Sequence, residues 1–495
     1  MAFFYFSFFH YALITVVILC FILHYLIYSR RVERWRSSNI PFLRPVFLFG
    51  HRYFFTHLFK HSVVVPLDRI YKENADQDIL AFFITAAPVI LLKSPRLIKA
   101  VYAKSFDKMF ENGFFPPAED TAAMSVIPLT SDRAIWKTGR SSMAPQFSTS
   151  RLGGVEFAKV KTQVDRLLCN VEKLRESGGP IDGKEAAHNF IVDSVNLWNF
   201  GVDTNSWEKK TELYEIIGTL FALSYHRLVC FFVLSLFPFL QVFESLRFIP
   251  RKQVDSVTNF LEETMKFRDE NLVDRNDFVD RLMSLRAGNV ARNNNDGSKN
   301  EAQEGVSLKE MVGYSLSWLL AGSDTSSQMC LFATHLLSIH PEYQNRIREE
   351  VDEAMKKHQV SEITFEVVQD LRLTELCLLE TSRLYPILPS IMRCALEDFK
   401  IPGTEYNLRR GDRVIIIPYS MHRDPKYFKD PDTFFPERFS PEFKEYACMD
   451  VYASFGCGPR KCPGKVTRSE WHWRPHILHR SCIDTSCHQD PIHGK

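Results

Sequence analysis

The stretch Phe455-Gly-Cys-Gly-Pro-Arg-Lys-Cys-Pro-Gly464 decides the fold, because the other motifs of the chain can be ordered around it. Its glycines and prolines disfavour helix and strand alike, so it is predicted to be a loop. The loop presents the thiol of Cys462 two residues after Arg460. A thiolate is a soft donor to metals, and a guanidinium group matches the geometry of a carboxylate. The loop therefore indicates a ligand that is metallic at its centre and acidic at its edge.

Haem has both properties, because an iron ion lies at its centre and carboxylates at its edge. Backbone N–H groups of a glycine-rich loop can also point at a ligating sulfur. The alternative is an ordinary loop with an inert cysteine, which is the commoner use of these residue types. Motifs elsewhere in the chain have to distinguish the two.

The composition limits the class of protein. The 495 residues include 61 basic and 59 acidic side chains, and a net charge of +2 gives no reason to expect nucleic acid as a partner. The 11 cysteines are scattered, which argues against a disulfide framework and for a reducing compartment. The 41 phenylalanines suit a large apolar interior or contact with a membrane.

The N-terminal segment, residues 3–28, contains no Asp, Glu, Lys or Arg and is long enough to span a bilayer as a helix. The basic residues that follow, Arg30, Arg31, Arg34 and Arg36, place the rest of the chain in the cytosol by the positive-inside rule. A cleaved signal peptide is disfavoured, because no charged region precedes the run and no small-residue cleavage site follows it. We expect a transmembrane anchor at 3–28 and a basic, Pro-marked linker at 29–50.

Residues 79–85 and 89–92 are predicted to form a pair of strands, and helical patterns dominate from residue 94 onward. The apolar stretch 228–243 is interrupted by a proline, and it fits either a core segment or one that dips into a membrane. The polar stretch 287–305 is predicted to be a flexible linker, or an exposed loop within one domain.

A long helix is predicted to start after Ser307, which forms a capping box with Glu310, and to end before Pro341. Its middle reads Ala-Gly-Ser-Asp-Thr-Ser at 321–326. Glycine weakens a helix there, and hydroxyls can bond back to preceding carbonyls, so a local distortion would leave room for a ligand. Asp324 and Thr325 could then donate protons at this point, although a simple helix-packing notch is the alternative.

Two further pairs have helical spacing. Trp136 and Arg140 lie four residues apart, which puts them on one helix face, where they could also be an ordinary stacking pair. Glu380 and Arg383 lie three apart among leucines, which favours a buried pair over a solvated one. A buried pair needs a further partner for its spare donors and acceptors, and Arg438 is a candidate.

These motifs together resemble the cytochrome P450 family of haem-thiolate monooxygenases, in the style of an animal microsomal member, over roughly residues 41–464. The family's loop F-x-x-G-x-R-x-C-x-G is complete as Phe455, Gly458, Arg460, Cys462 and Gly464. The oxygen-activation, E-x-x-R and W-x-x-x-R motifs stand at 321–325, 380–383 and 136–140. The resemblance implies a mainly α fold with small β-sheets, and one haem-thiolate monooxygenase domain over 51–464.

The resemblance also implies roles for individual residues. Cys462 would ligate haem iron as a thiolate, which pushes electron density onto the metal. The haem propionates would be held by Arg460, Trp136, Arg140 and Arg393. Asp324 and Thr325 would deliver protons to dioxygen, of which one atom leaves as water and the other enters the substrate. The substrate pocket would be lined by 113–128, 215–243 and 386–392.

The implied reaction is insertion of one oxygen atom into a lipophilic small molecule that is a xenobiotic or is like a steroid or fatty acid. Electrons would come from NADPH through a flavoprotein reductase, with cytochrome b5 as a further candidate partner. The implied location is the endoplasmic reticulum membrane, with a single pass and the catalytic domain in the cytosol.

The resemblance ends at about Lys465. The family continues with a helix along the proximal side of haem and then with strands, whereas this chain has Arg468, Trp471 and Pro475 and ends 33 residues after Cys462. We expect 465–495 to be an atypical tail in which the proximal helix and last strands are missing. The hypothesis that follows is a catalytically impaired or haem-deficient form, because an exposed apolar strip would cost about 1.5–3 kcal/mol per large side chain.

A zinc site is a minor alternative. Two Cys-x4-Cys pairs and nearby histidines could supply its ligands: Cys457, Cys462, Cys482, Cys487, His472, His476, His479 and His488. The first pair lies inside a complete haem loop, which disfavours this alternative.

Overall fold

The computed structural model describes residues 2–464 with internal gaps. The gaps are 48, 54–63, 85–86, 114–125, 149–150, 152, 221–229, 231–232, 235–239, 241–242, 244–245, 247–248 and 287–304. Three predicted regions therefore lie wholly or largely outside the described residues: the polar linker up to residue 304, much of the pocket lining, and the tail at 465–495 with its missing proximal helix and strands. The basic linker at 29–50 is described except for residue 48, and its first part, up to Arg36, is helical.

The chain divides into two compact units. The first unit comprises 1–116, 223–246 and 390–420, and the second comprises 117–222, 247–389 and 421–495. The prediction of one domain over 51–464 stays a prediction. Helical and 3-10 segments outnumber short strands, as a mainly α fold with small sheets requires.

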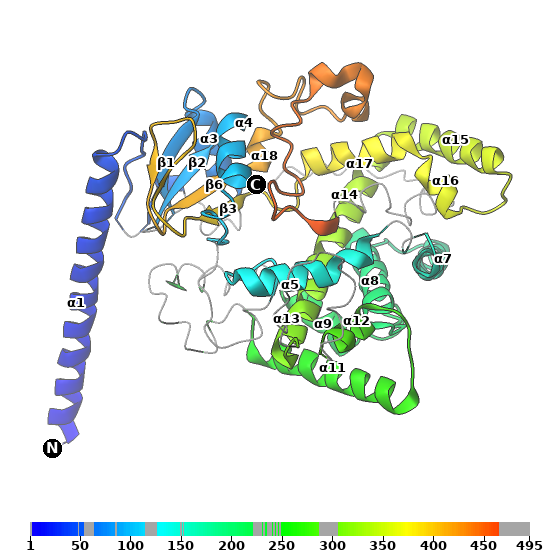
Figure 1. Ribbon diagram of the computed structural model, residues 1–495, viewed down its shortest axis with the longest axis horizontal. Helices are drawn as coiled ribbons and strands as arrows, with labels where there is room; N and C mark the ends of the chain where they lie inside the picture. The colour runs from blue at the N-terminus through cyan, green and yellow to red at the C-terminus, as the bar shows by residue number, and fades with distance from the viewer. Residues whose placement is uncertain are drawn as a thin grey trace, which may run out of the picture. The chain divides into compact units, whose positions relative to one another are not determined.

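The first unit is built on a four-stranded sheet with the order β1-β2-β6-β3. Its elements are α1 (Ala2–Arg36), α3 (Val64–Glu73), β1 (Ile79–Ile84), β2 (Ala87–Leu92), α4 (Pro95–Ile98), the π-helix η2 (Lys99–Lys104), β3 (Ile391–Cys394), β4 (Phe399–Lys400), β5 (Asn407–Leu408) and β6 (Arg413–Ile416). The predicted strand pair is confirmed: β1 and β2 run antiparallel, and Figure 1 shows them side by side. β2 pairs with β6 in parallel, and β6 pairs with β3 antiparallel. The apolar side chains of Phe82, Ile90 and Val414 are fully buried, so the sheet forms the core of this unit.

The helix α1 covers the predicted anchor, and its C-terminal end is tied to the first unit. Arg34 makes a bidentate pair with the buried carboxylate of Asp412, and the Tyr28 hydroxyl donates to the carbonyl oxygen of Pro45 at 2.9 Å. Within the part of the chain that the structure describes, no helix has the length and apolar character needed to cross a bilayer. The prediction that 3–28 spans a membrane is therefore not supported.

The second unit is helical. Its elements are α5 (Arg133–Met143), η4 (Ala144–Phe147), α7 (Val155–Glu176), α8 (Gly183–Val195), η5 (Asn196–Phe200), α9 (Glu212–Leu220), α11 (Arg251–Asn271), α12 (Phe278–Arg286), α13 (Leu308–Trp318), η9 (Leu319–Asp324), α14 (Thr325–Ile339), α15 (Pro341–His358), α16 (Phe365–Gln369), α17 (Arg372–Leu384), η10 (Pro436–Phe439) and η11 (Pro441–Tyr446). The short helix α18 (Pro418–Met421) carries the chain from the first unit into the second.

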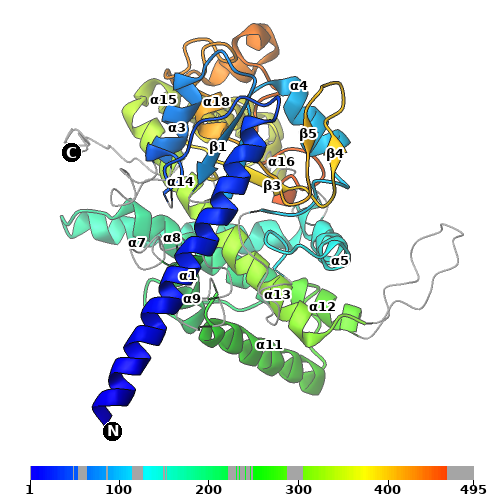
Figure 2. The ribbon, with the colours of Figure 1, turned by 90° about the vertical axis from the view of Figure 1, so that its left-hand side faces the viewer.

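The predicted long helix is present as α13, η9 and α14, which Figures 1 and 2 show as one continuous rod. The capping box is confirmed, because Ser307 and Glu310 exchange backbone and side-chain hydrogen bonds. Trp318 and Leu319 are buried in a large apolar cluster of this unit, and α8 and α17 pack against α14. The long helix is therefore the axis on which the second unit is assembled.

The helix α5 lies very close to α13, and glycine permits this approach. A Cβ atom at Gly139 would lie 2.6 Å from the Tyr314 ring and 2.8 Å from Ile127. The Tyr314 hydroxyl also donates to the carbonyl oxygen of Ile135 at 3.2 Å. The side chains that α5 carries are thus held in place by the long helix.

Replacing Gly139 by alanine is expected to destabilise the protein by about 1–3 kcal/mol, because the added methyl group overpacks the contact with Tyr314. The urea midpoint of unfolding measures this effect. Gly218→Ala is the matched control, since nothing lies within 4 Å of a Cβ atom built on that helical glycine. Equal midpoints for the two variants would contradict the prediction.

Candidate functional site

The loop at 455–464 is closed by its own backbone. The Cys462 N–H donates to the carbonyl oxygen of Phe455 at 2.8 Å, and the Lys461 N–H donates to that of Gly458 at 3.0 Å. Gly456 and Gly458 have φ angles of +79° and +70°, a region that residues with a Cβ atom rarely adopt. These turns leave Cys462 at the surface of the unit, with its side chain exposed.

The helix α5 brings two predicted site residues to this loop. The guanidinium carbon of Arg460 lies 5.7 Å from the centre of the Trp136 ring, and Arg460 also donates to the carbonyl oxygen of Thr130 at 2.6 Å. Burial lowers the pKa of Arg140, and a nearby Cys462 sulfur partly opposes this shift. Trp136, Arg140, Arg460 and Cys462 therefore lie in one part of the second unit, and their predicted role in binding haem stays a prediction.

This set of donors fits haem. The thiol of Cys462 is accessible for a metal, and the two guanidinium groups of Arg140 and Arg460 suit acidic groups on the same ligand. Arg393 belongs to the first unit, where it is buried on β3, donates to the carbonyl oxygen of Met392 and lies over the Tyr102 ring. Its assignment to the haem propionates stays a prediction.

The predicted distortion of the long helix is present at 319–324, where the chain forms the π-helix η9. The Thr325 hydroxyl donates back to the carbonyl oxygen of Ala321 at 2.5 Å. The Asp324 carboxylate accepts a bond of 2.6 Å from the Gln328 amide. Burial raises the pKa of Asp324, and the Gln328 bond and the charge of Lys184 only partly oppose this rise. The Asp324 carboxyl group therefore keeps its proton to a higher pH than an exposed aspartate does.

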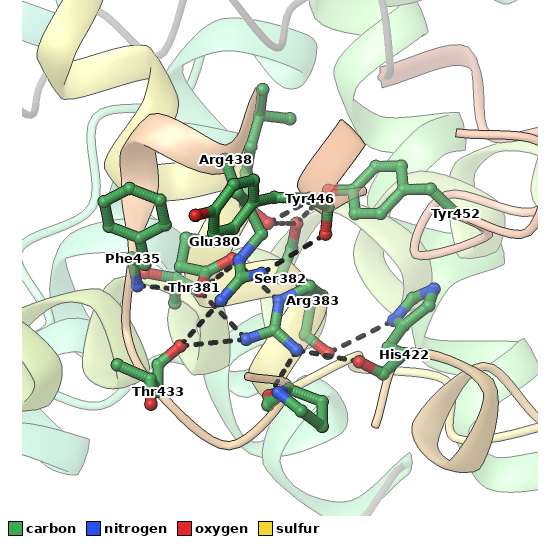
Figure 3. A network of polar contacts seen from close by, with 12 residues as sticks. Glu380, Thr381, Ser382, Arg383, His422, Thr433, Phe435, Arg438, Tyr446 and Tyr452 are labelled. Carbon is green, nitrogen blue, oxygen red and sulfur yellow. Dashed lines mark hydrogen bonds and ion pairs between the residues drawn. The ribbon is translucent and has the colours of Figure 1, made fainter. Parts of the chain in front are cut away.

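The buried triad of Glu380, Arg383 and Arg438 is confirmed. Arg383 binds the Glu380 carboxylate at 2.7 and 2.9 Å, and Arg438 binds it at 3.0 Å. The backbone N–H of Phe435 adds a bond of 2.9 Å to the same carboxylate. Figure 3 shows both arginines converging on Glu380, and all three charged side chains are at most 1% exposed.

The remaining N–H donors of Arg383 and Arg438 bind backbone carbonyl oxygens in the segment 422–446. These oxygens belong to His422, Lys429, Asp430, Pro431, Thr433 and Tyr446. One carboxylate and two guanidinium groups thus organise the long segment that leads towards the loop, as a buried ion pair with extra partners should.

Sequence reasoning missed a second set of contacts, which joins α17 to the start of the loop. The hydroxyl of Ser454 donates to the carbonyl oxygen of Ser382 at 2.8 Å, and the hydroxyls of Ser382 and Tyr452 lie 2.5 Å apart. His422 contacts both segments through its ring nitrogens. No short sequence motif indicates these contacts, because each bond joins residues at least 31 positions apart.

The described residues contain no further cluster of metal-binding side chains. Among the residues that the structure describes, no group of three or more His, Cys, Asp or Glu side chains is placed to hold a metal ion. Cys482 and Cys487, with the four neighbouring histidines of the zinc alternative, lie outside those residues.

Comparison with known proteins identifies the family. The sequence model described as Cytochrome P450 matches residues 40–466. Cytochrome P450 6k1 of Blattella germanica is 30% identical over 457 residues, covering 89% of this chain and 84% of the relative. Cytochrome P450 6a9 of Drosophila melanogaster is 28% identical, with coverage of 91% and 88%, and Cytochrome P450 3A14 of Cavia porcellus is 29% identical, with 76% and 73%. The chain therefore belongs to the cytochrome P450 family of monooxygenases, which use haem with a cysteine thiolate ligand and electrons from NADPH through a reductase.

Proposed function

We propose that this chain inserts one oxygen atom from O2 into a lipophilic small molecule, which is a xenobiotic or is like a steroid or fatty acid. The observation that carries the proposal is the position of Cys462 beside Arg140, in a loop whose Arg460 lies over Trp136. Haem bound there supplies the redox chemistry that activates dioxygen. The sulfur of Cys462 would hold its iron, and Arg140 and Arg460 would hold its carboxylates.

Asp324 and Thr325 would supply protons. Burial raises the pKa of Asp324, which favours the protonated carboxyl group at the end of the distorted turn. The Thr325 hydroxyl adjoins it and is held by the Ala321 carbonyl oxygen, so it can accept a proton and pass one on. A general acid placed in this way typically contributes 10²–10⁴-fold to rate, by order of magnitude.

The variants Asp324→Asn and Thr325→Val are expected to lower turnover of lipophilic probe substrates by about a hundredfold or more, because each removes a proton donor. The rate of product formation per chain with bound haem measures the effect. Thr334→Val is the matched control, since Thr334 makes the same type of backward bond, to Cys330, further along α14. A loss of equal size in the control would contradict the assignment.

The partners and location belong to the same proposal. A flavoprotein reductase would deliver the electrons, with cytochrome b5 as a second candidate, at the cytosolic face of the endoplasmic reticulum. The uncharged run at 3–28 and the arginines after it support association with that membrane. Fractionation of cells that express the full chain tests the location: recovery in the cytosolic rather than the microsomal fraction would overturn it.

A CO-difference spectrum of the purified full chain tests the function. A thiolate-type Soret band together with product formation from a probe substrate is the expected result. A folded chain without bound haem would instead favour the haem-deficient form that the atypical sequence at 465–495 suggests. Zinc without a porphyrin spectrum, found by metal analysis, would favour the zinc alternative.

A further inference from the structure

His422 occupies a position between α17 and the segment that enters the haem loop. Its side chain is completely buried, and both ring nitrogens have backbone partners. The Ala453 N–H donates to Nε2 at 3.1 Å, and Nδ1 lies 3.1 Å from the carbonyl oxygen of Arg383. Figure 3 shows the ring beside Arg383. Ala453 stands two residues before Phe455, the first residue of the loop.

These two bonds fix the protonation of the ring. An amide N–H can only donate, so Nε2 of His422 must be the nitrogen with the lone pair. A carbonyl oxygen can only accept, so Nδ1 must carry the hydrogen. A doubly protonated ring would lose the acceptor for Ala453. Burial lowers the pKa of His422 to about 3, although the backbone carbonyls of Arg383 and Val451 face the ring and partly oppose this shift, so the ring is neutral.

The surroundings of the ring hold it in this orientation. His422 stacks on Tyr452 with 5.3 Å between ring centres and 21° between ring planes, and it meets Phe428 edge-on at 5.7 Å. Tyr452 and Ser454 are each bonded to α17 through Ser382. Between Tyr452 and Ser454 lies Ala453, and its backbone N–H donates to His422 Nε2.

We propose that His422 is a positioning residue for the haem-binding loop. Its Nε2 fixes the Ala453 amide and hence the direction in which the chain enters the loop, while Nδ1–H ties the ring to the last turn of α17. Phe455, whose carbonyl oxygen closes the loop with the Cys462 amide, is then placed relative to α17 before any cofactor binds. The proposal rests on the proposed use of this loop for haem, but the bond between the Ala453 N–H and His422 is made without any cofactor.

Two substitutions separate the two ring nitrogens. His422→Gln keeps an amide oxygen near the position of Nε2, so the Ala453 N–H retains an acceptor. His422→Asn reaches only as far as Nδ1, so it keeps a donor to Arg383 and leaves the Ala453 N–H without a partner. A role in packing alone predicts that the shorter and the longer amide behave alike.

Hydrogen–deuterium exchange of the full chain is the main measurement, because it does not require haem. We expect exchange of backbone amides in 453–462 to be about tenfold faster in His422→Asn and within about twofold of the unmodified protein in His422→Gln. The CO-difference spectrum is the second readout, with the thiolate-type band kept by the glutamine variant and weakened in the asparagine variant. Exchange in α11, which is remote in sequence, should be unchanged in both.

Equal exchange in the two variants, whether both fast or both slow, would overturn the proposal. If the asparagine variant loses protection in α11 as well, it has unfolded, and exchange in the unmodified protein becomes the test. The Ala453 amide must then exchange among the slowest of 453–462, and rapid exchange of this amide overturns the proposal. A chain without haem would defeat the proposed function but leave the exchange result valid, so the two failures are distinguishable.

Discussion

Replacing Cys462 by serine is expected to abolish the thiolate-type band of the CO-difference spectrum and to lower monooxygenase turnover by at least about a hundredfold. Changes in residues that only support metal ligands already cost about 10–100-fold, and the ligand itself should matter more. A serine hydroxyl is a harder donor than a thiolate, and it stays protonated at neutral pH. The spectrum and the bound haem per chain measure the loss directly.

Cys457→Ser is the matched control for this prediction. Cys457 lies in the same loop, between Gly456 and Gly458, and its side chain is partly exposed. The substitution has the same chemistry but removes a sulfur that the proposal does not use. The control should therefore keep the thiolate-type band, and a loss in Cys457→Ser with retention in Cys462→Ser would reassign the ligand.

Replacing Glu380 by alanine is expected to lower the free energy of unfolding by about 3–5 kcal/mol. Removing one partner of a buried ion pair leaves uncompensated charge in the interior, and here two guanidinium groups, of Arg383 and Arg438, lose the same carboxylate. The backbone N–H of Phe435 loses its acceptor as well. The urea dependence of tryptophan fluorescence and the yield of folded protein measure the effect.

An exposed pair supplies the comparison. Lys400 and Glu405 form a salt bridge of 2.7 Å in which both side chains are at least half exposed. Glu405→Ala should cost only about 0–1 kcal/mol, because solvent screens such a pair. Glu380→Gln separates charge from hydrogen bonding, since it keeps an acceptor oxygen but no negative charge. Similar stability of Glu380→Ala and Glu405→Ala would show that the triad is not the main support of the segment at 422–446.

Features encoded in short sequence spacings could be predicted. The capping box at Ser307, the helix stop at Pro341, the strand pair at 79–92 and the helical pair Trp136–Arg140 depend on neighbours within a few residues. The triad could also be predicted, because the spare donors and acceptors of a buried Glu–Arg pair need a further partner, for which Arg438 was a candidate. The distortion at 319–324 followed from glycine and hydroxyl residues in the middle of a helix.

Contacts between distant segments could not be predicted. Nothing in the sequence shows that His422 accepts from Ala453, or that Gly139 lets α5 approach Tyr314, because both depend on how separate elements pack. The expected membrane span at 3–28 followed from its length, its lack of charged residues and the arginines after it, whereas no spanning helix is found among the described residues. The residue types of the segment also could not show that Arg34, at the C-terminal end of the same helix, pairs with Asp412.

The triad also sets an order of events during synthesis. Glu380 and Arg383 leave the ribosome together, but Arg438 follows Glu380 by 58 residues. At translation rates of about 5–20 residues per second, the carboxylate waits roughly 3–12 s for its second cation. Until Arg438 has been synthesised, Glu380 can pair only with Arg383. The segment that leads to the cysteine loop can therefore pack against α17 only after this interval.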